Sequence, residues 1–365
     1  MKKILIAPDS FKETFSNFEI AKLIKERLSI RYPYEYITMP IADGGEGTLD
    51  VINNALNIQI VNKEITGPNF ETITARYGII DKEIAVIECA EVVGFNNKKE
   101  TSRANNTTSY GIGEIIDECI NLGLKKIYIG LGGTITSDGG CGVLCALGVK
   151  FYHQTDEFIP TGATLNDITA IDITNIHRGI EIELLSDVTN PLYGPTGASY
   201  VYAKQKGATD EEIESMDQGL KNFANLTQQL LGHDYATEAS SGAAGGIGFA
   251  LKAYLNGKVS SGIDKILEII GFENEVKKCD LVITGEGKID YQSACGKAIS
   301  GVIRLSKKHN KDVVAIVGYM DGELEEFKRL GLKNVYASSH EKKSISEIRK
   351  TCVEDMCRLL GKIEL

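Results

Sequence analysis

Polar side chains that could bind a charged ligand recur in this chain directly after short apolar runs. The first group is P-D-S-F-K-E, which holds Asp9, Ser10 and Lys12 within four residues. It follows a predicted strand, and open α/β sheets bind ligands at the carboxyl ends of their strands. A carboxylate, a hydroxyl and an ammonium group together suit a small polar anion. The alternative is a plain loop in which Asp9 caps a turn.

A second group is the glycine turn A-D-G-G-E-G-T at residues 42–48. Gly44 and Gly45 permit a positive φ and a close approach of the backbone to a ligand. A helix is predicted from about Glu46, and the free N–H groups at its start favour an anion. Asp43 and Glu46 carry the hard oxygen ligands that Mg²⁺ prefers, so they are the candidate metal ligands. The alternative is a tight turn followed by an acidic first helical turn.

The longest glycine-rich segment is I-G-L-G-G-T-I-T-S-D-G-G at residues 129–140, between a predicted strand and a predicted helix. Backbone amides hold phosphate groups in that arrangement, although the motif G-x-x-x-x-G-K-[ST] is absent from the sequence. A shorter glycine turn leads into a helix at residues 242–251. The candidate nucleotide-binding residues are Gly132, Gly133, Thr134, Asp138, Gly139, Gly245 and Gly246. The alternatives are a structural turn for the first segment and close packing of a helix on a sheet for the second.

Two more segments combine carboxylates with other polar groups. I-T-G-E-G-K-I-D-Y-Q, at residues 283–292, carries Glu286, Lys288, Asp290 and Gln292 just past a predicted strand. S-D-V-T-N-P, at residues 186–191, carries Asp187 and Asn190, with an Asx turn before proline as the alternative. Asp and Lys at glycine turns, without a Cys/His cluster, point to phosphoryl transfer. Such catalysis needs mainly positioning and charge neutralisation by Mg²⁺ and Lys.

The apolar runs before these groups predict strands that are buried on both faces, as in a parallel sheet. Two strands are expected near the N-terminus, at residues 2–9 and 34–40, with helices from Ser16 and from about Glu46. Three more strands alternate with helices in the last third, at residues 280–287, 313–318 and 334–339. A single helix is expected over residues 263–276, and Ser344 is expected to cap the last helix. Five parallel strands indicate a flavodoxin-like domain.

The middle of the chain shows a different order of predicted strands and helices. Three strand-like runs follow one another between residues 58 and 90 without a helix, which implies antiparallel pairing. Helices are then expected at about residues 111–122, 139–147 and 210–231, and strands at 126–131, 149–153 and 181–187. We therefore expect a discontinuous first domain of residues 1–61 and 243–365. A mixed α/β domain of residues 62–242 is inserted into it, with the active site in the cleft between the two.

Composition and charge argue against several classes of protein. The chain of 365 residues has 40 Lys and Arg against 50 Asp and Glu, a net charge of −10, which argues against nucleic-acid binding. Its eight cysteines form no C-x-x-C pair, so we expect reduced thiols without a metal or redox role. No apolar run approaches the ~18 residues of a membrane span, and no signal peptide precedes the first strand. We therefore expect a cytoplasmic protein that binds no membrane, and a homodimer is left open.

Seven strings in this order resemble the bacterial glycerate kinase family, the D-glycerate 2-kinases. They are I-A-P-D-S-F-K-E, A-D-G-G-E-G-T, T-T-S-Y-G-I-G-E, G-G-T-I-T-S-D-G-G, S-D-V-T-N-P-L-Y-G, G-A-A-G-G-I-G and I-T-G-E-G-K-I-D-Y-Q-S. The resemblance runs from residue 4 to about 302. It implies ATP-dependent phosphorylation of D-glycerate, with the 2-phosphate favoured, by two α/β domains.

The sequence departs from the family pattern at four positions. Thr134 replaces a Ser and keeps its hydroxyl group, whereas three other changes alter the chemistry. Ser137 replaces an Asn in the glycine-rich segment, Lys204 replaces a Pro before Gln205 and Lys206, and Tyr110 replaces an Arg. Each of these three changes alters a contact that the resemblance would otherwise carry over to this chain.

These observations lead to a set of expected roles. Asp290 is the expected general base for the substrate hydroxyl, with Asp187 as the second candidate. Lys12 and Lys288 are expected to neutralise carboxylate or phosphate, while Asp9, Ser10 and Asn190 contact the substrate. ATP and Mg²⁺ are the expected cofactors. The alternatives are a kinase of another small hydroxy acid and a non-catalytic sensor of sugar acids.

Overall fold

The computed structural model describes residues 1–12, 14–290, 298–339, 341 and 345–365. The chain forms two compact units, each built from separate stretches of sequence. The first unit comprises residues 1–43, 50–55 and 263–365, and the second comprises residues 44–49 and 56–262. The expected domain bounds at 61/62 and 242/243 stay a prediction. No helix in the described ranges combines the length and the apolar character that crossing a membrane requires.

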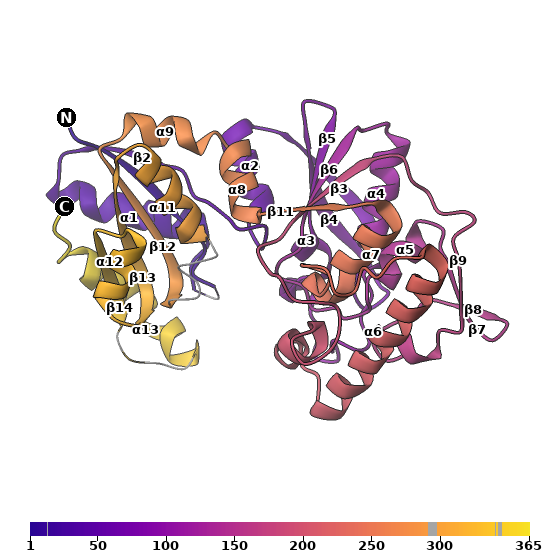
Figure 1. The fold of residues 1–365 in the computed structure, drawn as a ribbon. Helices are drawn as coiled ribbons and strands as arrows, with labels where there is room; N and C mark the ends of the chain where they lie inside the picture. The colour runs from indigo at the N-terminus through magenta and orange to yellow at the C-terminus, as the bar shows by residue number, and fades with distance from the viewer. Residues whose placement is uncertain (13, 291–297, 340, 342–344) are drawn as a thin grey trace. The chain divides into compact units, whose positions relative to one another are not determined.

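The first unit contains a five-stranded, wholly parallel sheet (Figure 1). Its strands, in order across the sheet, are β2 (Glu35–Thr38), β1 (Lys3–Pro8), β12 (Leu281–Asp290), β13 (Asp312–Asp321) and β14 (Asn334–Ser339). This is the strand order 2-1-3-4-5 of flavodoxin-like sheets. The predicted fold class is therefore confirmed.

Helices cover this sheet and explain its continuous apolar runs. Ile4 and Ile6 of β1 belong to one core cluster with α1 (Asn17–Arg31) and α13 (Ile345–Leu360). Leu5 is also fully buried, although it points to the opposite face of the strand. Helices α9 (Phe272–Lys278) and α11 (Ala298–Lys308) contact the sheet as well, and α12 (Leu324–Leu330) contacts β14. The predicted capping box of α1 is present, since Ser16 and Glu19 cap each other's backbone N–H.

The second unit is built on a six-stranded mixed sheet. Its strands, in order, are β3 (Gln59–Thr66), β4 (Thr72–Ile80), β5 (Ile84–Glu88), β6 (Lys126–Gly130), β10 (Glu181–Leu185) and β11 (Lys258–Ser260). The pairs β3–β4 and β4–β5 are antiparallel, as the consecutive strands predicted, and the other pairs are parallel. A small separate sheet holds β8 (Asp156–Phe158), β7 (Lys150–His153) and β9 (Ala170–Asp172).

The helices of the second unit pack around aromatic side chains. They are α3 (Cys89–Val93), α4 (Tyr110–Asn121), α5 (Cys141–Ala146), α6 (Asp210–Leu231) and α7 (Ile247–Leu255). Phe223 of α6 meets Phe249 of α7 edge to face, with ring centroids 5.2 Å apart. Two more helices, α2 (Thr48–Leu56) and α8 (Gly262–Ile269), contain residues of both units.

Three details of the predicted elements differ from the structure or fall outside it. The single helix expected over residues 263–276 is broken into α8 and α9, because Gly271 adopts a left-handed conformation with φ of 69°. Strand β12 does not end at its glycines. Its ladder with β13 continues to the pair Asp290–Asp321. Gln292, Cys295 and the expected cap Ser344 lie outside the described residues, and the seven described cysteines form no disulfide.

Candidate functional site

Three carboxylates lie at the carboxyl edge of the first unit's sheet. Asp9 follows β1, Asp43 follows β2, and the buried Glu286 lies on β12. The backbone N–H of Asp9 donates to Gly285 O across 2.8 Å, which fixes the start of the loop. Burial raises the pKa of Asp9 well above its ordinary range, and the charges of Asp43 and Glu286 raise it further. The three carboxylates therefore repel one another, a situation that a proton or a cation relieves.

Lys288 lies between two carboxylates at the same edge. Its Nζ is 3.2 Å from Asp290 Oδ2 and 2.9 Å from Asp321 Oδ2. Because side chains alternate along a strand, Lys288 and Asp290 project from the same face of β12. The hydrogen bond to Asp321 is the main reason that the pKa of Lys288 is raised, so its ammonium group is charged at neutral pH. The structure thus brings two of the predicted catalytic residues, Asp290 and Lys288, together.

The loop of Ser10 and Lys12 lies against β12. A Cβ atom at Gly287 would be 3.3 Å from Phe11 Cα and 3.5 Å from the backbone nitrogen of Lys12. Glycine at position 287 therefore lets the loop approach the strand closely. Ser10 and Lys12 consequently belong to the same edge as Lys288 and Glu286.

In the second unit the turn at residues 44–49 packs against the glycine-rich segment. Gly44 O accepts a hydrogen bond from the backbone N–H of Gly132 across 3.1 Å. The N–H groups at the start of α2 are already engaged, because buried Glu88 accepts from Gly47 N (Oε1, 3.0 Å) and Leu49 N (Oε2, 2.9 Å). A carboxylate of the protein itself thus occupies the helix start that was expected to favour an anion, while Glu46 is exposed.

Asp138 is fully buried and ties the glycine-rich segment to α4 and α5. Its Oδ2 accepts from Ser109 N and Ser109 Oγ, both across 2.7 Å, and from Gly142 N across 3.2 Å. Its Oδ1 accepts from Gly140 N across 3.0 Å. Burial raises the pKa of Asp138, and these four donors act in the opposite direction. This carboxylate fixes local structure, and its predicted contact with a nucleotide stays a prediction.

The second glycine turn packs backbone to backbone against the first. Gly139 N donates to Gly245 O across 3.0 Å. A Cβ at Gly245 would be 2.2 Å from Thr136 O, and one at Gly246 would be 2.6 Å from Gly139 Cα. Both glycines also have positive φ values. Both positions therefore need glycine whether or not a ligand binds. Gly133 of the first segment also has a positive φ, of 72°, but it is exposed.

Lys206 enters the glycine-rich segment from the short helical turn of residues 204–206. Its side chain is 3% exposed. Its Nζ donates to Thr136 O across 2.6 Å and to Thr134 Oγ1 across 3.4 Å. Burial lowers the pKa of Lys206 to about 7, although the charge of Asp138 opposes that shift.

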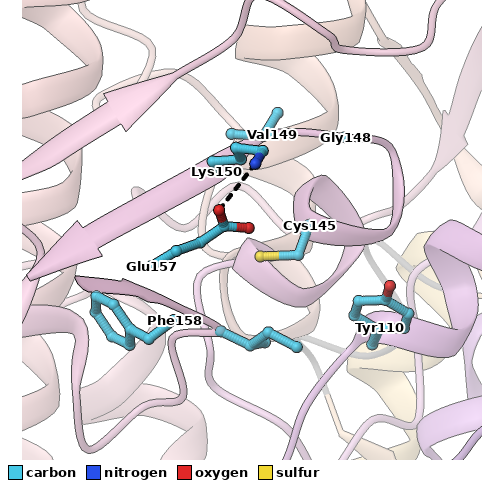
Figure 2. A pocket seen from close by; sticks show the side chains of 8 residues that line it. Tyr110, Cys145, Gly148, Val149, Lys150, Glu157 and Phe158 are labelled. Carbon is cyan, nitrogen blue, oxygen red and sulfur yellow. Dashed lines mark hydrogen bonds and ion pairs between the residues drawn. The ribbon is translucent and has the colours of Figure 1, made fainter. Parts of the chain in front are cut away.

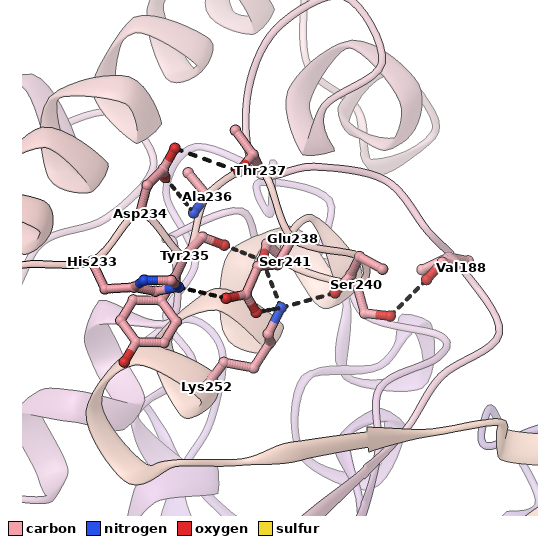
Figure 3. A network of polar contacts seen from close by, with 11 residues as sticks. Val188, His233, Asp234, Tyr235, Ala236, Thr237, Glu238, Ser240, Ser241 and Lys252 are labelled. Atoms are coloured by element: carbon pink, nitrogen blue, oxygen red, sulfur yellow. Dashed lines mark hydrogen bonds and ion pairs between the residues drawn. The ribbon is translucent and has the colours of Figure 1, made fainter.

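A network of polar contacts holds the loop that leads into the second glycine turn (Figure 3). Buried Lys252 Nζ is 2.6 Å from Glu238 Oε2, and His233 Nε2 is 2.9 Å from Glu238 Oε1. Burial alone would raise the pKa of Glu238, yet the bonds from Lys252 and His233 hold it below its ordinary value. Ser240 Oγ donates to Val188 O across 2.7 Å, which ties this loop to the segment after β10.

That segment carries Asp187 and Asn190, both with partners inside the protein. Asp187 Oδ1 accepts from Gly262 N across 3.0 Å at the start of α8. Asn190 Nδ2 donates to Thr196 O across 2.8 Å, and Asn190 Oδ1 accepts from Tyr202 Oη across 2.6 Å. Asp187 lies in the second unit and Asp290 in the first.

A cavity of about 330 Å³ lies elsewhere in the second unit (Figure 2). Tyr110, Cys145, Val149 and the paired Lys150 and Glu157 are among its lining residues. Tyr110, which departs from the family pattern, therefore faces this cavity. None of the predicted site residues lines it.

Two residues of these networks were missing from the predicted site. Lys206 stands in the polar run Y-A-K-Q-K-G-A, which is typical of an exposed segment, and only its place in a family string marks it. Glu88 is the last residue of the apolar strand β5. A single carboxylate at the end of an apolar run was the sequence feature that could have marked it as a site residue. Among the residues that the structure describes, no three acidic, His or Cys side chains are arranged to hold a metal by themselves.

Comparison with known proteins identifies the family. A family model described as the glycerate kinase family matches residues 4–363. Glycerate kinase of Bacillus cereus is 37% identical over 361 residues, which cover 97% of this chain and 95% of that protein. Glycerate 2-kinase of Escherichia coli is 36% identical over 98% of this chain and 95% of its own length.

A solved structure agrees over almost the whole chain. The crystal structure of a putative glycerate kinase 2 from Salmonella typhimurium LT2 superposes with a TM-score of 0.79 at 36% identity. The match covers 99% of this chain and 96% of that one. The resemblance found in the seven strings is therefore confirmed. The chain belongs to the glycerate kinase family and, as a member, is a kinase for which ATP is the implied phosphoryl donor.

Proposed function

We propose that this enzyme transfers the γ-phosphoryl group of ATP to the 2-hydroxyl of D-glycerate, giving 2-phosphoglycerate and ADP. The name of the Escherichia coli relative, glycerate 2-kinase, supports the regiochemistry. The observation that carries the proposal is the polar edge of the flavodoxin-like sheet, where Lys288 contacts Asp290 and Asp321. A cation between carboxylates can bind an anionic substrate while a neighbouring carboxylate removes a proton.

The first unit is assigned the acceptor side of the reaction. Asp290 takes the proton of the glycerate hydroxyl as its oxygen forms a bond to the γ-phosphorus. The bond from that phosphorus to the β–γ bridging oxygen breaks, and its electron pair leaves with ADP. Lys288 and Lys12 neutralise the carboxylate of glycerate or the phosphoryl group in transfer, and Asp9 and Ser10 contact the substrate. Two residues of the second unit are further candidates: Asp187 is the second candidate for the base, and Asn190 is a further substrate contact.

Mg²⁺ is the proposed metal, with Asp43 and Glu46 as its protein ligands. The donor types fit, because both residues carry carboxylates with hard oxygen atoms, and the charge of Asp43 acts unfavourably on buried Asp9, a repulsion that a cation relieves. At kinase sites Mg²⁺ is usually held by one or two carboxylates together with phosphate oxygens and water. When bound, the ion would neutralise charge on the phosphoryl group in transfer.

The second unit is assigned the nucleotide. Gly132, Gly133, Thr134 and Gly139 line the segment that would hold the phosphates, together with the turn of Gly245 and Gly246. Most of the N–H groups measured there already have partners in the protein, as at Gly132 and Gly139. The exposed Gly133 is the strongest backbone candidate of the set.

Coupled measurement of ADP release, with ATP, Mg²⁺ and D-glycerate, tests this function, and phosphorus NMR identifies the product. We expect turnover that yields 2-phosphoglycerate. Production of 3-phosphoglycerate would overturn the regiochemistry alone. Absence of ADP release from folded protein would overturn the assignment to D-glycerate, and a screen of other small hydroxy acids would then separate another kinase from a sensor that binds without turnover.

A further inference from the structure

Lys206 is buried, and burying a charged lysine side chain costs free energy. Its side chain is 3% exposed, and among the described residues no carboxylate lies within 4.0 Å of its Nζ. Its partners are a carbonyl oxygen and a hydroxyl, both from the glycine-rich segment after β6. A buried ammonium group without a counterion is disfavoured by desolvation. Such a group is explained when a ligand supplies the missing negative charge.

Two more cations lie beside the same turn. Arg103 Nη1 donates to Gly207 O across 3.0 Å. Lys98 Nζ would be 3.7 Å from a Cβ atom at Gly207. Both side chains are exposed, and neither makes an ion pair with a described carboxylate, while Lys98 also lies over the ring of Phe95. Two exposed cations thus lie beside Gly207, the residue that follows Lys206 in the chain.

A buried hydroxyl group without a partner belongs to the residue after Thr136, which Lys206 contacts. Ser137 Oγ is fully buried and has no hydrogen-bond partner in the structure. Ser137 follows Thr136, whose carbonyl oxygen accepts from Lys206 Nζ. Buried hydroxyl groups are normally satisfied, so an orphan at this point is a second sign of a polar ligand.

We propose that Lys206, Arg103 and Lys98 form an anion subsite of the second unit that binds the phosphates of ATP, with Ser137 Oγ as an additional donor. This deepens the proposed function and rests on it. Three cations suit a polyphosphate, which carries several negative charges, better than the single carboxylate of glycerate. The planar guanidinium group of Arg103 can contact two phosphate oxygens at once.

Within the described ranges, Asp138 is the charged group that acts on Lys206. Asp138 comes from the glycine-rich segment, and its carboxylate is held by Ser109, Gly140 and Gly142. Arg103 and Lys98, from the segment between α3 and α4, lie beside the next residue, Gly207. Since the Asp138 carboxylate is already held by these donors, a bound anion can supply further negative charge near Lys206.

Titration calorimetry with adenosine, AMP, ADP and ATP tests the subsite without requiring turnover. In the wild-type enzyme we expect affinity to rise with each added phosphate. Lys206→Met keeps the length of the side chain and removes its charge, and it should weaken ATP binding by about 10- to 100-fold while adenosine changes less than about twofold. Arg103→Gln, at an exposed position, should weaken ATP binding by about 3- to 10-fold.

Lys204→Gln is the matched control. Lys204 lies two residues from Lys206, is exposed and pairs with Asp210 across 3.0 Å, so its loss should leave ATP affinity within about twofold. Circular dichroism and the melting temperature check that each variant is folded. If Lys206→Met does not fold, Arg103→Gln and Lys98→Gln still decide the question. Unchanged ATP affinity in folded variants, or a loss confined to glycerate binding, would overturn the subsite.

The same experiment separates this inference from the proposed function. If the affinity of the wild-type enzyme rises from adenosine to ATP and this rise is lost in Lys206→Met, the subsite is supported. That result holds even if D-glycerate is not the acceptor. Turnover of D-glycerate by the wild-type enzyme with unchanged ATP affinity in Lys206→Met would leave the function intact and reject the subsite.

Discussion

Two hydrogen bonds join Ser109 to the buried carboxylate of Asp138 in the second unit. The backbone N–H and the hydroxyl of Ser109 both donate to Asp138 Oδ2 across 2.7 Å. Ser109 Oγ also accepts from Val143 N across 3.1 Å, so this one hydroxyl joins the start of α4 to α5. The glycine-rich segment between them is held by the protein's own polar groups before any ligand binds.

Removing that hydroxyl should therefore cost stability. Ser109→Ala leaves Val143 N without its partner and removes one donor from Asp138, and we expect the free energy of unfolding to fall by about 1–3 kcal/mol. Ser137→Ala is the control, because its buried hydroxyl has no partner to lose, and we expect a change within about 0.5 kcal/mol. Urea unfolding measures both. Equal losses in the two variants would contradict the role given to Ser109.

The acidic edge of the first unit predicts a pH-dependent stability. The folded pKa of Asp9 is raised, first by burial and then by Asp43, so the charged carboxylate destabilises the fold at neutral pH. That penalty is present above the raised pKa and disappears as pH falls through it toward the ordinary value near 4. Asp9→Asn should therefore be more stable than the wild type at pH 8, by at least about 1 kcal/mol, and the gap should close near pH 4.

Urea unfolding at the two pH values tests the Asp9 prediction. Asp312→Asn is a suitable control in the same unit, since Asp312 is exposed and pairs only at the surface with Lys333. We expect it to change stability by less than about 1 kcal/mol at either pH. A gain for Asp9→Asn that does not depend on pH would contradict a raised pKa of Asp9 in the folded protein. Loss of activity should accompany the gain, because sites hold destabilised charges for function.

Much of the fold follows from sequence patterns that act locally. Apolar runs predicted the five parallel strands, and α6 begins and ends at the predicted residues 210 and 231. The extension of β12 to Asp290 was not predicted, because the glycines at 285 and 287 are typical of a turn. The neighbouring strand β13 supplies the hydrogen bonds that keep this stretch extended. Such a tertiary ladder has no local signature.

In the candidate site, too, some residues were predictable from local sequence and others depend on tertiary contacts. The expectation that both residues follow a strand was enough to place Asp290 and Lys288 at one edge of the sheet, although they lie on β12 itself. The burial of Lys206 depends on how residues 98–104 and the glycine-rich segment pack around it, which no spacing in the sequence reveals. In the same way, Glu88 reaches the start of α2 across 39 and 41 positions of sequence, to Leu49 and Gly47. Both are contacts between segments that only the folded chain brings together.

Asp290 and Asp321 offer a matched test of the general base. Both carboxylates contact Lys288 and they are register partners on β12 and β13. If Asp290 is the base, Asp290→Asn should lower kcat by at least about 100-fold. Asp321→Asn removes the other partner of Lys288 and should lower kcat by less than about 10-fold. Steady-state kinetics with saturating ATP and D-glycerate measures both. Equal effects of the two variants would assign the carboxylates to positioning Lys288 instead.

The affinity for ATP should fall as pH rises above neutrality. Burial lowers the pKa of Lys206 to about 7, so at pH 8 most of the free enzyme carries a neutral amine there. If ATP binds the ammonium form, binding takes up a proton, and the dissociation constant should rise by up to tenfold per pH unit above 7. Asp138 is the nearby acid, and its carboxylate is already satisfied by four donors.

Calorimetry between pH 6.5 and 8.5 measures this dependence, and buffers of different ionisation enthalpy report the proton uptake directly. ATP itself titrates in the same range, so the Lys206→Met enzyme supplies the background to subtract. We expect the ratio of the two dissociation constants, variant to wild type, to be largest near pH 6.5 and to shrink toward pH 8.5. A ratio that stays constant across the range would mean that Lys206 keeps its proton in the free enzyme, because a permanently charged side chain contributes equally at every pH.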